Sequence, residues 1–274
     1  MAMKGLIASI YISIQVESNW TKKFLYLLYL FFAPLSSILI VCIIYGFLGQ
    51  GFNSPSFYFA LFGSLSYFIL ADTFFNTAYT VIDDREHYRV LKYIIVSKTY
   101  YIVYLLGRGI GKFALSFVGI TLNLLWIFPV FNIDTHFSLI LFVISIGVGF
   151  VGAFGLALLF SSYYLLAIRE ETSLLDVLFG GLYLISGAMF SPTVLPGILS
   201  KIASYFPIST AIEMTRFSIF GGHLTPYFQG TPFSQFMFIF IVSNIISLLV
   251  GLVMFEIALS SAIKKGYIDV TTAF

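Results

Sequence analysis

The charged residues of this chain gather in one stretch, 83–98, which separates two long apolar segments. Six side chains of clear charge lie within ten residues there: Asp83, Asp84, Arg85, Glu86, Arg89 and Lys92. Val90, Leu91 and Ile94 lie among these charges, and an apolar ridge beside charged groups is typical of a surface that binds another protein. The pattern predicts a short helix over 88–95 that contacts a partner; the alternative is a solvated loop rich in charge. The expected contact residues are Glu86, Arg89, Leu91 and Lys92.

A second polar connection, 169–172, also lies between two apolar segments. It is short, and it carries the adjacent carboxylates Glu170 and Glu171. Adjacent charges between two apolar segments form polar surface that a partner protein can bind. We therefore expect Glu170 and Glu171 to form a second contact with the same partner.

Asp72 lies inside an apolar segment shortly before the charged stretch, with Asn76 one helical turn further along. A charge near the centre of a bilayer costs about 2.5 to 3.5 kcal/mol on insertion scales, so such a residue usually faces a cavity or a partner. Two interpretations stay open for Asp72 and Asn76. They line a translocation pathway, or they make hydrogen bonds between helices.

The sequence predicts neither a catalytic site nor a metal site. His87, His136 and His223 lie in three different connections, without the spacing of metal ligands. The Gly-x-Gly-x-x-Gly pattern of residues 147–152 lies within an apolar segment, whereas a nucleotide-binding pattern must join a strand to a helix. The Gly-Lys pair before Phe113 lacks the Ser or Thr of a phosphate-binding loop. We therefore expect a chain that is not an enzyme and has no ATP site or cofactor of its own.

The composition indicates an integral membrane protein. Of the 274 residues, 59% are hydrophobic and only 9% are charged, against roughly 25% charged residues in a soluble domain. Apolar segments follow at 24–48, 57–82, 101–128, 137–168, 174–190 and 236–262. They predict an all-α membrane protein with six transmembrane helices in a single domain, 1–274. The net charge of +2 is too small to indicate nucleic-acid binding.

Two further patterns concern how the spans pack. Small residues recur at every fourth position of the segment 137–168, namely Ser145, Gly149, Ala153 and Ala157. Such a face lets transmembrane helices approach closely. Arg108 and Lys112 lie about one turn apart near the start of the segment 101–128, and we expect their long side chains to reach toward lipid headgroups.

The distribution of basic residues predicts the orientation in the membrane. Of the fourteen Lys and Arg residues, all but Lys201 and Arg216 fall on one side of the six segments. Because basic loops mark the cytosolic side, both termini and the stretch 83–98 are predicted to be cytosolic in a multi-pass protein of the cell membrane. Residues 1–22 carry apolar side chains at helical spacing and predict an amphipathic helix lying flat in the interface. The alternative for 1–22 is an extension of the first span into water.

The connection 191–235, on the opposite side, holds five of the eight prolines and two short amphipathic stretches, 195–205 and 208–220. The apolar side chains of these stretches are unsuited to open water. Because proline ends a helix at the preceding residue, we expect two extracellular re-entrant half-helices, and not a plain loop. Glu213 and Arg216 are three residues apart on one helix face, and we expect them to pair near the outer surface.

Three features together resemble the membrane-spanning permease of type-2 ATP-binding-cassette (ABC) exporters. The first is the amphipathic N-terminal helix before six spans. The second is Glu86 followed by VLKYI at 90–94, VS at 96–97 and YLLGR at 104–108, which is similar to the family's cytosolic coupling helix. The third is ISGAMF at 185–190 with LP at 195–196, FPI at 206–208 and EMTR at 213–216, which is similar to the family's C-terminal signature. The chain departs from the family where Tyr88-Arg89 replaces Gly-Thr and Lys98 replaces Pro.

The resemblance implies two permease subunits, identical or related, that pair with two separate ABC ATPase subunits. ATP and Mg would then be bound by the ATPase partner, and the exported molecule would be a drug, a lipid or a glycan-type amphipathic substrate. The runner-up is an ion-coupled secondary transporter or channel, with Asp72 as the ion-coupled acid; more intramembrane carboxylates or interrupted helices in matched halves would favour it. A membrane scaffold without transport is a third interpretation.

Overall fold

The computed structural model describes residues 2–19, 21–49, 51–52, 54–97, 99–131, 133, 136–167 and 172–268. Within these residues the regular secondary structure is all helical, with no strand. The long helices are α2 (Lys23–Phe47), α3 (Pro55–Ile82), α5 (Tyr101–Phe131), α6 (Leu139–Leu166) and α10 (Phe233–Lys265). The shorter ones are α1 (Ala2–Ser18), the π-helix η1 (Asp83–His87), α4 (Leu91–Val96), α7 (Thr172–Ile185), η2 (Pro192–Val194), α8 (Gly197–Tyr205), α9 (Pro207–Phe220) and η3 (Pro226–Phe228).

Five helices are long and apolar enough to cross a membrane: α2, α3 continued by η1, α5, α6 and α10. With a rise of about 1.5 Å per residue, each exceeds the hydrocarbon thickness of about 30 Å. The predicted segment 174–190 instead forms the 14-residue helix α7, which ends at Ile185 and is shorter than that thickness. The five helices agree with an all-α membrane protein, whereas the six-span layout stays a prediction.

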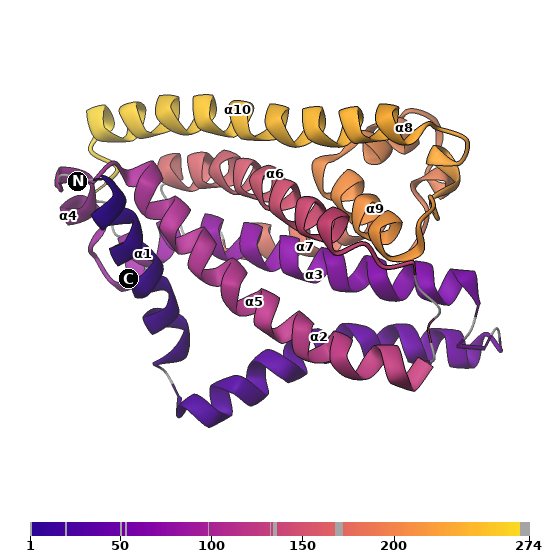
Figure 1. Ribbon diagram of the computed structural model, residues 1–274. Helices are drawn as coiled ribbons and strands as arrows, with labels where there is room; N and C mark the ends of the chain where they lie inside the picture. The colour runs from indigo at the N-terminus through magenta and orange to yellow at the C-terminus, as the bar shows by residue number, and fades with distance from the viewer. Residues whose placement is uncertain are drawn as a thin grey trace.

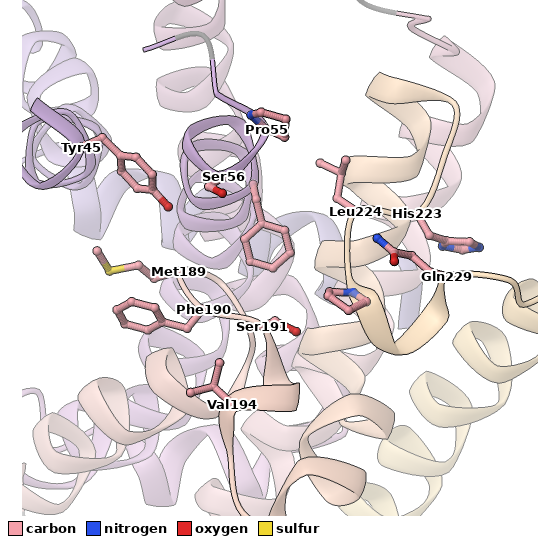
Figure 2. A pocket seen from close by; sticks show the side chains of 12 residues that line it. Tyr45, Pro55, Ser56, Met189, Phe190, Ser191, Val194, His223, Leu224 and Gln229 are labelled. Atoms are coloured by element: carbon pink, nitrogen blue, oxygen red, sulfur yellow. The ribbon is translucent and has the colours of Figure 1, made fainter. Parts of the chain in front are cut away.

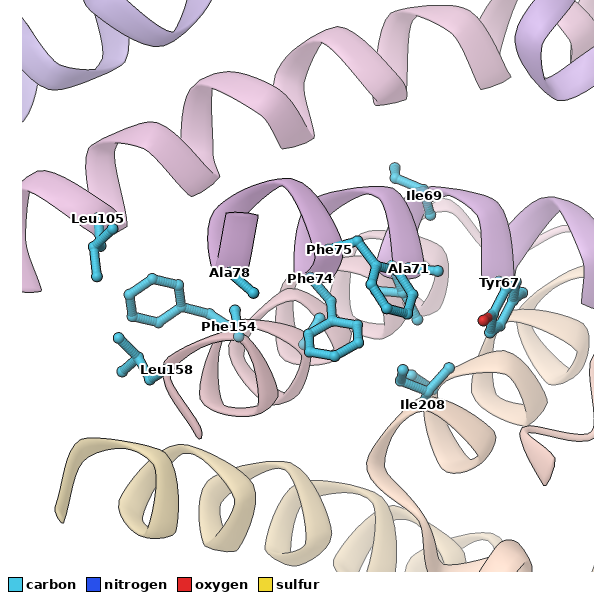
Figure 3. Close-up of a cluster of buried hydrophobic side chains, with 14 of the residues drawn as sticks. Tyr67, Ile69, Ala71, Phe74, Phe75, Ala78, Leu105, Phe154, Leu158 and Ile208 are labelled. Atoms are coloured by element: carbon cyan, nitrogen blue, oxygen red, sulfur yellow. The ribbon is translucent and has the colours of Figure 1, made fainter. Parts of the chain in front are cut away.

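Helix α3 lies at the centre of the bundle, among α2, α5, α6 and α9 (Figure 1). In its most apolar stretch 78% of the residues are buried, against at most 39% in the other long helices. Figure 3 shows Phe74 and Ala78 of α3 beside Phe154 and Leu158 of α6 in the apolar core. A helix enclosed in this way must find partners for its polar groups inside the protein.

Helices α6 and α10 lie side by side and touch through glycine. A Cβ atom on Gly251 would lie 2.1 Å from the carbonyl oxygen of Gly155, and one on Gly155 would lie 2.4 Å from the backbone nitrogen of Leu248. Ser247 donates a hydrogen bond of 2.9 Å to the carbonyl oxygen of Gly152 across the same interface. The two backbones therefore meet directly, as small residues permit in membrane helices.

The predicted small-residue face of α6 lies on a different side of the same helix. A Cβ atom on Gly149 would lie 3.0 Å from the Cβ atom of Ala211 in α9 and 3.2 Å from a methyl group of Leu70 in α3. The other three members of the face are buried. This face packs closely against α3 and α9, which confirms the prediction of a close helix approach.

Helix α1 packs along the first half of α5 through small residues on both helices. A Cβ atom on Gly107 would lie 2.4 Å from the Cβ atom of Ser9, and one on Gly111 would lie 2.5 Å from that of Ser13. The apolar residues of α1 point the other way, since Met3 is 75% exposed. The small and polar face of α1 therefore contacts the protein, and its apolar face is turned outward, where lipid would cover it.

Helices α8 and α9 form a hairpin beside one end of α10 (Figure 1), over the two ranges predicted for the half-helices. Pro207 opens α9, where its missing N–H group leaves no bond unmade. The hydroxyl group of Thr210 is 3.0 Å from that of Ser243, and the carbonyl oxygen of Ser218 accepts a bond from the amide of Ser138. The turn between α8 and α9 thus lies about 15 Å along α10, counted from Phe233. From that turn, α9 runs back to the level where α6 begins. The position of this hairpin in a membrane stays a prediction.

We expect Gly251→Ala to lower the melting temperature of the detergent-solubilised protein, because the added methyl group would meet the backbone of α6. Overpacking of this kind typically costs about 1 to 3 kcal/mol. Gly147→Ala is the matched control, since a Cβ atom at Gly147 of α6 has no neighbour within 4 Å. Equal melting temperatures for the two variants would contradict the close approach of α6 and α10.

Candidate functional site

Buried charges concentrate at the end of the bundle where α1, η1, α4 and the start of α5 meet (Figure 1). The fully or almost fully buried members are Asp84, Arg85, Glu86, Arg108 and Lys112. Removing an unpaired charge from water costs several kcal/mol, so each of these groups requires a partner inside the protein. This region, which we call the charged end, also contains the stretch that the sequence predicts to bind a partner.

Asp84 joins η1 to α5. Its carboxylate accepts hydrogen bonds from the hydroxyl groups of Tyr104, at 3.2 Å, and Tyr101, at 3.5 Å. Arg108 donates to the same Tyr104 hydroxyl at 3.1 Å, while its carbonyl oxygen accepts a bond of 2.8 Å from Ser13 of α1. The predicted reach of Arg108 toward lipid headgroups is therefore wrong. Polar contacts run without a break from η1 through α5 to α1.

Arg85 joins η1 to the end of α6. Its Nε atom is 2.8 Å from Oε1 of Glu86, and its Nη1 atom donates to the carbonyl oxygens of Tyr164, at 3.0 Å, and Ala167, at 2.9 Å. The last carbonyl groups of a helix have no partner within it, so the guanidinium satisfies the end of α6. Glu86 is only 5% exposed, and its carboxylate holds Arg85 instead of lying on the exposed contact surface that the sequence predicts.

Lys112 lies between carboxylates from two neighbouring helices. Its Nζ atom is 2.8 Å from Oε2 of Glu17 in α1 and 3.9 Å from Oδ2 of Asp72 in α3. Asp72 also accepts hydrogen bonds from Asn76, at 2.8 Å, and from Ser116 of α5. The predicted reach of Lys112 toward headgroups is wrong, because these carboxylates pair with it inside the bundle. Asp72 and Asn76 take part in hydrogen bonds within and between helices, while a role in translocation stays a prediction.

Helix α4 turns its apolar face inward. Leu91 is 1% exposed and packs in the core, so the prediction that it belongs to an exposed ridge is wrong. The exposed side carries Tyr93 and Val96, which is 86% exposed, together with Arg89 and Lys92. We call these four residues the α4 ridge. Arg89 has φ 54°, a left-handed conformation uncommon for a residue with a side chain, and it reorients the chain between η1 and α4.

A groove of about 500 Å³ separates α1 from the α4 segment. Its walls are mainly apolar or small side chains: Gly5, Ala8, Ile12 and Val16 on one side and Tyr88, Val90, Tyr93 and Ile94 on the other. Asp84, Tyr104 and Arg108 close the base. A partner side chain that entered the groove would therefore reach the polar contacts that link η1 to α5.

Glu170 and Glu171, the predicted second contact, lie outside the described residues, as does Lys98 at the end of the charged stretch. Ala167, the last described residue before that connection, accepts a hydrogen bond from Arg85 of η1 through its carbonyl oxygen.

At the opposite end, Arg216 and Glu213 of α9 form the predicted pair, but inside the protein. Their closest charged atoms are 3.7 Å apart, and both side chains are almost fully buried. The guanidinium also donates to the carbonyl oxygens of Phe59, Gly187 and Ala188 at 2.8 to 3.1 Å. Burial lowers the pKa of Arg216 to about 10, so the group remains charged at neutral pH. Arg216 ties α9 to α3 and to the turn after α7.

Gly63 of α3 makes room for this guanidinium. A Cβ atom there would lie 1.9 Å from Nη2 of Arg216 and 2.0 Å from the carbonyl oxygen of Ala188. Glu213 in turn accepts hydrogen bonds from the hydroxyl group of Thr225 and from its backbone amide, the latter at 3.1 Å. The loop after α9 is therefore held by the same ion pair.

A cavity of about 360 Å³ opens beside this ion pair (Figure 2). Its lining includes Tyr45, Met189 and Phe190 on one side and Leu224 and Gln229 on the other. Phe59 also lines it, and the ring of Phe59 lies 3.5 Å from the guanidinium carbon of Arg216. The lining is mostly apolar or aromatic, so the cavity suits an apolar or aromatic group.

No protein-family model matches this chain, and no curated protein matches it.

Sequence reasoning missed Glu17, Tyr101 and Tyr104 as members of the charged end. A signal for Glu17 was present, because Ser9, Ser13 and Glu17 recur at every fourth residue and define one face of a helix. The complementary spacing of small residues on α5 could have matched that face to α5. The two tyrosines carry no comparable signal, since aromatic residues are abundant throughout the chain.

We expect Lys112→Met to destabilise the protein by about 3 to 5 kcal/mol, because it leaves two carboxylates without their cation. Thermal unfolding in detergent measures this, with exposed Lys92→Met as the matched control. Adding Glu17→Gln and Asp72→Asn to Lys112→Met should restore much of the loss, since neutral side chains need no counter-charge. A melting temperature of Lys112→Met equal to that of the control would refute the pairing.

We expect Arg216→Lys to destabilise the α8–α9 hairpin although it keeps the charge, because one ammonium group cannot reach all three carbonyl oxygens. Each buried acceptor left without a donor costs about 1 to 3 kcal/mol. Gly63→Ala should have a similar effect by displacing the guanidinium, whereas Gly222→Ala, which has no neighbour within 4 Å, should not. Thermal unfolding and size-exclusion profiles test this, and a wild-type profile for Arg216→Lys would show that its carbonyl contacts are dispensable.

Proposed function

We propose that this chain is the membrane-spanning permease subunit of an ABC exporter, which forms the translocation path and receives mechanical work from a separate ATPase subunit. The observation that supports this most directly is the α4 ridge. It is an exposed set of aromatic, aliphatic and basic side chains on a short helix that is anchored to the long helices. The proposal includes the six-span layout, cytosolic termini in the cell membrane, and a second permease subunit.

The anchoring of the α4 segment suits it to transmit force. Helix η1 continues α3 directly, Asp84 binds α5, and Arg85 binds the end of α6. Leaving a buried charged group without its hydrogen-bond partner is costly, so movement of α4 is passed to α3, α5 and α6 before those contacts break. A partner that binds ATP and Mg and changes shape on hydrolysis would thus move three spans together.

The proposed substrate is an amphipathic molecule of the drug, lipid or glycan type. The cavity beside Arg216 supports this, because its walls are mainly aromatic and aliphatic, with polar groups from Ser56, Ser191, His223 and Gln229. Helices α8 and α9 would close the path on the external side. Arg216 would keep the hairpin attached to α3 while the path opens and closes.

The alternative is an ion-coupled transporter in which Asp72 carries the ion or proton. It is favoured by the position of this carboxylate within α3, in contact with polar groups of α5. The charge of Asp72 is already balanced by Lys112, which gives an incoming cation less to gain. Uptake driven by an ion gradient in vesicles containing the chain alone, and lost in Asp72→Asn, would favour this alternative.

We expect Val96→Asp to release the ATPase subunit, because a charge replaces an exposed apolar group at the proposed contact. Loss of an interface anchor typically costs 2 kcal/mol or more, about thirtyfold in binding. The measurement is ATP hydrolysis that copurifies with the affinity-purified permease. Leu48→Asp is the matched control. Leu48 is also exposed and apolar, but it caps the C-terminal end of α2, away from the charged end.

Wild-type retention of ATPase activity by Val96→Asp would overturn the assignment of the contact to the α4 ridge. Leu91→Asp is unsuitable for this test. Leu91 is buried, so a charge there would disrupt the packing of α4 before it affected any partner.

A further inference from the structure

Away from both ion-pair clusters, a groove of about 420 Å³ runs along an outward-facing side of α10. Ile239, Val242, Ile246 and Val250 form its floor, and Leu159 of α6 and Tyr205 of α8 flank it. Leu156 and Ser247, which also line the groove, adjoin the place where the backbones of α6 and α10 touch at Gly155. The groove therefore lies beside the close approach of these two helices.

The groove has the length of one membrane leaflet. From Ile239 to Val250 the helix rises about 16 Å, which is close to half of the hydrocarbon thickness of about 30 Å. Helix α10 has 33 residues and is about 50 Å long, so it extends about 10 Å beyond the hydrocarbon at each end when centred. Ile239 then lies at the hydrocarbon boundary on the α8 side, and Val250 lies near the bilayer centre.

The boundary end of the groove carries hydrogen-bond donors. The hydroxyl group of Tyr227 donates to that of Tyr205 at 3.2 Å. This bond raises the pKa of Tyr227, so its hydroxyl group stays protonated at neutral pH. Lys201 lies four residues before Tyr205 on α8, hence on the same helix face, and it is exposed. Tyrosine and lysine are the side chains expected where a protein meets lipid headgroups.

We propose that a phospholipid of the leaflet on the α8 side occupies this groove, with an acyl chain along α10 and its phosphate at Lys201 and at the hydroxyl group of Tyr205, which accepts from Tyr227 and keeps its own proton to donate. The apolar groove is as long as one leaflet is thick, which suits an acyl chain. The hydrogen-bond donors at its boundary end suit the phosphate of the same lipid. A partner helix would fill the groove without using the donors at its boundary end. The inference requires α6 and α10 to span a membrane, and it does not depend on an ATPase.

The test is native mass spectrometry of the full chain, purified with its partners in detergent, delipidated and then titrated with palmitoyl-oleoyl phosphatidylglycerol. Ile246→Trp places a bulky side chain in the groove and should weaken phospholipid binding by roughly tenfold or more. A tenfold change in affinity corresponds to about 1.4 kcal/mol of binding free energy. Ile245→Trp is the matched control, since Ile245 is exposed on the same helix and does not line the groove. Melting temperatures establish that both variants are folded.

The headgroup contact is tested separately. Lys201→Ala should weaken retention about fivefold, which corresponds to about 1 kcal/mol for one basic side chain at a lipid surface. Lys23→Ala, at the start of α2, is the control and should retain phospholipid as the wild type does. Equal retention by Ile246→Trp and Ile245→Trp would overturn the proposal, because the bound lipid would then be spread over the apolar surface without a site. Unchanged retention by Lys201→Ala would overturn the assignment of the phosphate.

Discussion

Burial of α3 forces its charged groups to find partners inside the protein, and both ion-pair clusters follow from that requirement. Asp72 and Asp84 are satisfied by α5, and Arg85, one residue beyond, is satisfied by the end of α6. At the other end of α3 the backbone itself is the hydrogen-bond acceptor. The carbonyl oxygen of Phe59 accepts a hydrogen bond from Arg216 of α9. Helices α5, α6 and α9 are thus each attached to α3 or to its continuation η1 by a polar contact that is costly to leave unmade.

Small residues complete the attachment, because lipid gives apolar helices no hydrophobic reason to associate. Dispersion contacts and hydrogen bonds must hold the bundle, and both weaken steeply with distance. Glycine lets α1 approach α5 and lets α6 approach α10, which brings the polar groups within bonding range. A groove lies beside the contact of α6 with α10, and the exposed α4 ridge lies beside the charged contacts that hold α1, α3 and α5.

The sequence by itself determined the class of the protein and much of its helical layout. Composition predicts a membrane protein, and the apolar segments agree with the five long helices to within a few residues at most ends, as 236–262 does with α10 (Phe233–Lys265). Proline positions located α8 and α9, since proline restricts where a helix begins and ends. The pair Glu213 and Arg216 was predictable from its spacing, because both residues lie on one turn of one helix.

The tertiary structure decided which way the polar side chains point. Lys112 pairs with Glu17 across 95 residues of chain, and Arg216 binds carbonyl oxygens of α3 and of the turn after α7. Every residue has a backbone carbonyl oxygen, so the sequence does not indicate which of them will accept a hydrogen bond from Arg216. A high density of charges likewise predicts a solvated segment, yet Asp84 and Arg85 of η1 are buried because α5 and α6 supply their hydrogen-bond partners. Local pattern can place a residue on a helix face, whereas only the packing of helices determines what covers that face.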